Sequence, residues 1–73
     1  MSIGTDRVRV SFNPSSDAHI DDIKRRTAEL IDLCDGIKQG AGPEQARLAA
    51  LAMTQYEDAA MWAVKAATAS VPA

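Results

Sequence analysis

The 73-residue sequence holds few of the side chains that most catalytic and metal sites use. His19 and Cys34 are the sole histidine and cysteine, so the chain has neither an internal disulfide nor a His/Cys pair at metal-ligand spacing. No glycine-rich loop leads into the Lys-Ser/Thr of a phosphate-binding P-loop. Neighbouring carboxylates such as Asp21 and Asp22 diverge by about 100° on a helix and do not converge on one substrate. We therefore expect no enzyme activity, no metal and no cofactor.

Long apolar runs and an excess of basic charge are also missing. The longest uninterrupted apolar runs, as in residues 48–53, have six residues, far short of the ~20 that span a bilayer. The net charge of -2 argues against a general nucleic-acid binder. We expect neither a membrane nor a nucleic-acid partner. The lone cysteine and the lack of a hydrophobic signal after Met1 predict a reducing, cytoplasmic compartment.

Helical periodicity dominates the chain from residue 17 onward, and it predicts an all-α fold. Two apolar stripes follow the 3,4 spacing of packed helices. The first comprises Ile20, Ile23, Thr27, Leu30, Cys34 and Ile37, and the second Ala46, Ala49, Met53, Tyr56, Ala60, Ala63 and Ala67. A short turn at residues 40–43 makes the helices antiparallel neighbours. We predict an antiparallel helical hairpin domain, 17–69, with helices 17–39 and 43–69, and a C-terminal tail, 70–73.

Residues 1–16 have a different pattern, which predicts a short N-terminal extended arm. Val8, Val10 and Phe12 alternate with polar residues at period two, and Asn13-Pro14 disfavours helix. The arm has no partner strand in the chain. We expect it to pack on the helices or to cross to a neighbouring subunit.

Several apolar residues of the second helix lie off its predicted packing stripe, so one partner helix cannot cover them all. They are Leu48, Leu51, Met61, Trp62 and Val64. We expect these side chains to lie between subunits of a homo-oligomer.

Basic residues gather at the pole where the first helix begins and the second ends. Lys24 and Lys65 both fall there in an antiparallel hairpin, close to the arm that carries Arg7 and Arg9. Such charges have two interpretations. They balance neighbouring carboxylates on a solvated surface, or they line a pocket that accepts an anion.

Three segments favour the second interpretation by their resemblance to a known family. The arm ends in FNPS, the first helix opens with DDIKRRTAELID, and the second contains LAMTQYEDAAMWAVKAAT. Together they resemble, over residues 5–69, the hairpin domain shared by bacteriophage anti-CBASS and anti-Thoeris sponge proteins. The resemblance implies a non-enzymatic homo-oligomer, typically a hexamer, that acts in the cytoplasm of the infected bacterium. Such sponges sequester cyclic di- and trinucleotide immune signals and, in one branch, glycocyclic ADP-ribose.

The resemblance also implies ligand-binding residues. The lysine that contacts cyclic dinucleotides matches Lys24, and polar positions beside it match Arg26 and Thr27. The family's arm supplies a tyrosine that stacks on a base. No tyrosine stands there in this chain, and Phe12 or Arg9 is expected to substitute, the latter through its guanidinium plane.

A second set of residues corresponds to the family's cyclic trinucleotide pocket. Lys65 matches the basic residue that closes the second-helix motif, with the backbone of Ala66 and Ala67 beside it. The alternative to a sponge is a small helical oligomerisation or protein-interaction module that has no nucleotide ligand and binds through its exposed apolar residues. A DNA-binding regulator is disfavoured by the acidic pI and by the lack of a helix-turn-helix pattern.

Overall fold

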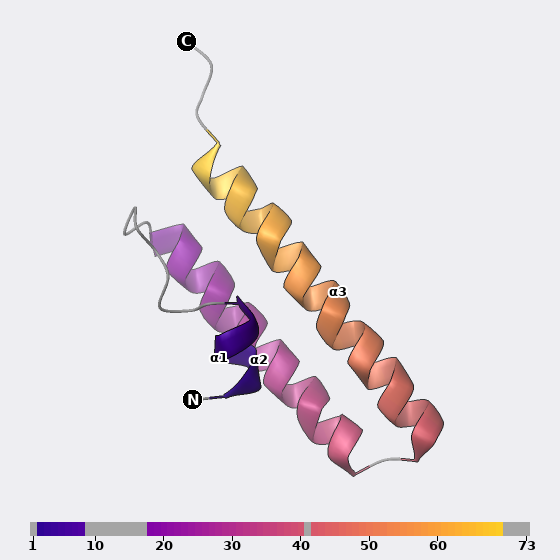
Figure 1. The fold of residues 1–73 in the computed structure, drawn as a ribbon. Coiled ribbons are helices and arrows are strands. Elements are labelled where there is room, and N and C mark those ends of the chain that lie inside the picture. The colour runs from indigo at the N-terminus through magenta and orange to yellow at the C-terminus, as the bar shows by residue number, and fades with distance from the viewer. Residues whose placement is uncertain (1, 9–17, 41, 70–73) are drawn as a thin grey trace.

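The computed structural model describes residues 2–8, 18–40 and 42–69, which form three helices. These are α1 (Ile3–Val8), α2 (Ala18–Gln39) and α3 (Pro43–Thr68). α2 and α3 run antiparallel side by side, and α1 lies against α2 (Figure 1). The predicted all-α helical hairpin is thus confirmed, with one helix more than the sequence pattern indicated.

The start of α3 follows from its proline and glycine. Pro43 occupies the first turn, where its missing N–H breaks no helical hydrogen bond, and Gly42 is the N-cap residue with extended backbone. One turn on, Arg47 donates hydrogen bonds to both carboxylate oxygens of Glu44. These bonds lower the pKa of Glu44, but both side chains are exposed and we assign the pair no stabilising role.

The core lies along the seam between α2 and α3, and α1 adds to it. Ile31 and Met53 are the largest fully buried side chains. They cluster with Val8, Ala28 and Ala60. The predicted inward stripe of α3 is confirmed. Ala49, Met53 and Ala60 are buried, and Ala46, Tyr56, Ala63 and Ala67 are half-buried. The small residues of this stripe allow the two helix backbones to approach closely.

The predicted inward stripe of α2 is partly wrong. Leu30 and Ile37 are 40% and 44% exposed. Ile20 of that stripe is buried and Ile23, Thr27 and Cys34 are half-buried, but the other buried residues of α2 lie off the stripe: Lys24, Ala28 and Ile31. α1, which the pattern did not predict, also covers α2: Gly4 lies against the backbone of Ala28, and Val8 clusters with Ala28 and Ile31. Lys24 fits among these buried residues because the methylene stem of lysine can cover apolar surface.

The prediction of an extended arm is wrong for residues 3–8, which form α1. The backbone N–H of Thr5 donates to Ser2 Oγ, and the N–H of Ser2 donates to Thr5 Oγ1, each at 3.1 Å. This reciprocal arrangement is a capping box, with threonine in the place usually taken by Glu or Gln. The rest of the arm, 9–16, and residues 70–73 of the predicted tail lie outside the described residues.

In the part of the chain that the structure describes, no helix is long and apolar enough to cross a bilayer. The same residues contain no group of three or more His, Cys, Asp or Glu side chains that could hold a metal ion.

Candidate functional site

A pocket of about 530 Å³ lies where the three helices meet. α1 supplies two of its lining residues, α2 supplies one and α3 supplies the others. The lining residues are Arg7, Val8, Lys24, Thr54, Glu57, Asp58, Ala60, Met61, Val64 and Lys65. Its size falls within the ~300 to 1,000 Å³ typical of small-molecule sites.

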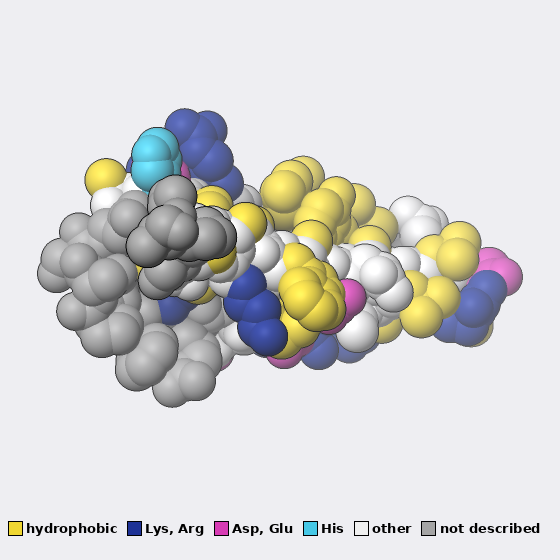
Figure 2. Space-filling model, turned by 90° about the horizontal axis from the view of Figure 1, so that it is seen from above, with side chains coloured by type: hydrophobic (Ala, Val, Ile, Leu, Met, Phe, Trp, Pro, Cys, Tyr) yellow, Lys and Arg dark blue, Asp and Glu magenta, His cyan; other side chains and the backbone are white. Residues whose placement is uncertain are grey.

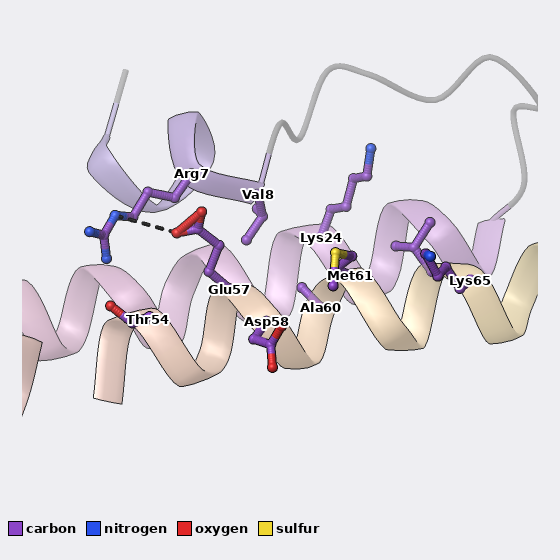
Figure 3. A pocket seen from close by; sticks show the side chains of 10 residues that line it. Arg7, Val8, Lys24, Thr54, Glu57, Asp58, Ala60, Met61 and Lys65 are labelled. Atoms are coloured by element: carbon purple, nitrogen blue, oxygen red, sulfur yellow. Dashed lines mark ion pairs between the residues drawn. The ribbon is translucent and has the colours of Figure 1, made fainter. Parts of the chain in front are cut away.

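Basic side chains outnumber acidic ones in this pocket, although the chain as a whole is acidic. Lys24 leaves α2 on the side of the hairpin where α1 lies (Figure 3). It is only 6% exposed, whereas Lys65 on α3 is exposed. The pocket thus combines a buried lysine from α2 with an exposed lysine from α3.

Arg7 enters the pocket from α1 and forms an ion pair with α3. Its Nε lies 3.7 Å from Oε2 of Glu57 (Figure 3). Another guanidinium nitrogen, Nη1, is buried and has no hydrogen-bond partner among the described residues. Arg7 therefore links α1 to α3.

Lys65 is positioned by the aromatic residue one turn before it. Its Nζ lies 5.1 Å from the centre of the Trp62 ring, within the range of a cation–π interaction. Trp62 is itself 59% exposed. The indole ring thus gives an otherwise flexible lysine a preferred position at the edge of the pocket.

The structure brings together two of the residues predicted to bind ligand and separates others from them. Lys24 and Lys65 line one pocket of the protomer. Arg26 is exposed, and the hydroxyl of Thr27 donates to the carbonyl oxygen of Ile23 in its own helix, at 2.6 Å. Neither residue lines this pocket.

The remaining predicted ligand-binding residues have no established place in the pocket. Ala66 is exposed and Ala67 is half-buried, one turn beyond Val64, and neither lines it. Arg9 and Phe12 lie outside the described residues. Their ligand-binding roles stay predictions.

Sequence reasoning missed the contribution of α1 to the pocket. Arg7 and Val8 were assigned to an extended arm, and the pairing of Arg7 with Glu57 could not be inferred from such an arm. The signal that could have found the helix is Ser2-Ile3-Gly4-Thr5, in which two hydroxyl residues stand three apart, as in a capping box.

The apolar residues predicted to lie between subunits are largely exposed in the protomer. Leu48, Leu51, Met61 and Trp62 are 46% to 59% exposed. Figure 2 shows hydrophobic side chains exposed along the length of the hairpin. Val64 is half-buried, and together with Met61 it also lines the pocket. The assignment of these residues to an interface stays a prediction.

In the comparison with protein families, the chain matches the model described as Acb2/Tad1, hairpin domain, over residues 3–68. The matched segment runs from the start of α1 to the end of α3. The chain belongs to the Acb2/Tad1 hairpin family. This is the family of anti-CBASS and anti-Thoeris sponges to which the sequence motifs pointed. No curated protein and no solved structure matches the chain in the corresponding comparisons.

The pocket lies within the part of the chain that matches the Acb2/Tad1 family. The match includes all three helices and therefore every residue that lines the pocket. It is consistent with a site for a cyclic nucleotide.

Proposed function

We propose that this protein is a phage anti-defence sponge that binds cyclic nucleotide immune signals and releases them chemically unchanged. The observation that carries the proposal is the placement of Lys24 and Lys65 on one pocket at the junction of the helices. A cyclic di- or trinucleotide presents phosphates to such cations and flat bases to apolar surface. The captured signal would no longer reach a CBASS or Thoeris effector.

Binding follows from charge and shape complementarity. Lys24 and Lys65 donate charge-assisted hydrogen bonds to ligand phosphates, each worth about 1.5 to 3 kcal/mol. Val8, Met61 and Val64 offer apolar surface to the sugars and bases. Stacking adds about 1 to 3 kcal/mol for each base on an aromatic ring, and Trp62 or the predicted Phe12 would supply the ring. Several such contacts together reach nanomolar affinity, about -12 kcal/mol.

The absence of chemistry is part of this proposal. A sponge has to bind its signal more tightly than the immune effector does, and it gains nothing from cleaving it. Glu57, which could act as a base in the pocket, is engaged by Arg7. Asp58 is the other carboxylate that lines the pocket, and we expect neither side chain to hydrolyse the ligand.

We further propose that the protomers assemble into a homo-oligomer, a hexamer by analogy with the resemblance described above. Leu48, Leu51 and Trp62 would lie between subunits, because side chains of this size are seldom left this exposed in groups on a monomer. Met61 and Val64 belong both to the predicted interface and to the pocket. Assembly would therefore bring a second subunit close to the ligand.

The experiment is a calorimetric titration of the protein with a panel of cyclic dinucleotides, cyclic trinucleotides and glycocyclic ADP-ribose, with the solution mass measured on the same sample. We expect nanomolar binding of at least one member at a fixed ratio per oligomer. If a well-folded oligomer binds none of them, the sponge proposal fails, and the exposed apolar surface would then favour a protein-interaction module.

A further inference from the structure

α1 forms one wall of the pocket but is too short to hold its place unaided. It has six residues, and isolated helices below ~12 residues are marginal in water. Through Arg7 and Val8 it nevertheless supplies two of the residues that line the pocket. Whatever fixes α1 on the hairpin therefore also fixes the shape of the pocket.

The contact that fixes the start of α1 is a hydrogen bond to α2. The backbone N–H of Gly4 donates to Oδ1 of Asp32 at 2.7 Å. Gly4 is the second residue of α1, and the first N–H groups of a helix have no partner within it. A carboxylate acceptor makes this bond stronger than a neutral one. Asp32 therefore completes α1 from another helix.

The close approach of the two backbones makes the contact specific. A Cβ atom built on Gly4 would overlap the carbonyl oxygen of Ala28. α1 thus rests directly on the backbone of α2, one turn before Asp32. At the other end of α1, Val8 joins the core cluster and Arg7 pairs with Glu57.

We propose that Asp32 is the positioning residue of the pocket: it holds α1 on α2 so that Arg7 and Val8 form the pocket wall. Asp32 does not line the pocket and acts on the ligand only through α1. The proposal rests on the proposed function for the identity of the ligand. It assigns to Asp32 the anchoring of α1 on α2, a role that Lys24 and Lys65 do not share.

The local capping of α1 separates helix formation from helix docking. Ser2 and Thr5 exchange hydrogen bonds within α1 itself. Loss of the Asp32 carboxylate leaves these bonds intact and removes only the hydrogen bond that Gly4 donates to α2. The expected consequence is a pocket whose α1 wall is displaced on an otherwise intact hairpin.

The test compares Asp32→Ala with Asp32→Asn, in which the side-chain oxygen can still accept the hydrogen bond from Gly4. The matched control is Asp35→Ala, which removes a carboxylate of the same helix that bonds only to Gln39 within α2 among the interactions described. Each variant is titrated with the cyclic nucleotide that binds the unaltered protein most tightly. We expect Asp32→Ala to raise Kd by about tenfold or more, with Asp32→Asn and Asp35→Ala close to the unaltered protein.

A second measurement needs no ligand. Nuclear magnetic resonance reports the hydrogen exchange of the Gly4 amide and the contacts of the Val8 methyl groups with the core cluster. Asp32→Ala should speed exchange at Gly4 by about tenfold or more and weaken the Val8 contacts, and Asp32→Asn should preserve both.

The outcomes separate this inference from the proposed function. If the unaltered protein binds the panel and Asp32→Ala binds equally well, the positioning role is refuted and the sponge proposal stands. If the unaltered protein binds nothing, the sponge proposal fails. In that case unchanged Gly4 exchange and Val8 contacts in Asp32→Ala would overturn the positioning role as well, whereas their loss would support it as a feature of the fold.

Discussion

Lys24 of α2 and Lys65 of α3 line the same pocket, the first almost completely buried and the second exposed. The antiparallel arrangement of the hairpin brings them to one pole, as the sequence predicted. Their different burial gives them different expected roles. A buried cation contributes more to binding, because water and salt screen its charge less.

Replacement of Lys24 should therefore have the largest effect on affinity. Lys24→Met keeps an apolar stem and removes the charge, and we expect the Kd of a cyclic dinucleotide to rise roughly tenfold to a hundredfold. Lys24→Glu should abolish binding and leave the oligomer intact. Lys38→Met, on the exposed last turn of α2, is the control. Unchanged affinity of Lys24→Glu in calorimetry would rule out this assignment.

Lys65→Ala should weaken cyclic trinucleotides more than cyclic dinucleotides. A third phosphate requires another cation, and Lys65 offers one at the edge of the pocket. The size of the effect should fall with added salt, because an exposed charge is screened. Titrations of both ligand classes with Lys65→Ala and with Lys38→Ala test this. An equal loss for both ligand classes would argue against the assignment of Lys65 to the trinucleotide.

The two helical glycines of α1 and α2 should respond in opposite ways to alanine. Gly4→Ala places a methyl group against the Ala28 carbonyl and should lower the free energy of unfolding by about 1 to 3 kcal/mol. Gly36 is exposed and has no atom near an added Cβ. Because glycine within a helix loses more conformational freedom on folding than alanine, Gly36→Ala should raise the free energy of unfolding by about 0.5 to 1 kcal/mol. Urea denaturation at one protein concentration measures both. Equal stability of Gly4→Ala and the unaltered protein would show that α1 does not dock as described.

Leu51→Glu should break the oligomer without unfolding the protomer. Leu51 is 50% exposed, so a carboxylate there remains hydrated in the monomer but would be buried without a partner in an interface. Gln55→Glu, also exposed on α3, is the matched control. Light scattering should give a smaller mass for Leu51→Glu alone, with helical circular dichroism unchanged. A retained mass would place the interface elsewhere.

Sequence reasoning succeeded for α3 because small residues recur there at one consistent spacing. It failed for part of α2 because Leu30 and Ile37 are apolar and yet exposed. Periodicity cannot distinguish apolar residues that are exposed on the protomer from apolar residues that form its core. The family resemblance predicts that Lys24 binds ligand, but nothing in its local pattern indicated that it is buried.

The N-terminal segment shows a different limit of prediction from the sequence. The alternation of Val8, Val10 and Phe12 favoured an extended arm, whereas α1 is held by a capping box and by contacts to α2. A tertiary hydrogen bond between Gly4 and Asp32 leaves no signal in local periodicity. For this reason the wall that α1 gives to the pocket could only be seen in the folded structure.

The most direct test of the central claim is recovery of the ligand. A cyclic nucleotide is incubated with excess protein, the mixture is passed through a filter that retains the oligomer, and the retained fraction is denatured and analysed by chromatography. The account predicts that the nucleotide disappears from the filtrate and returns in full, still cyclic, after denaturation. Nucleotide that stays in the filtrate, or that emerges as a linear product, would contradict it.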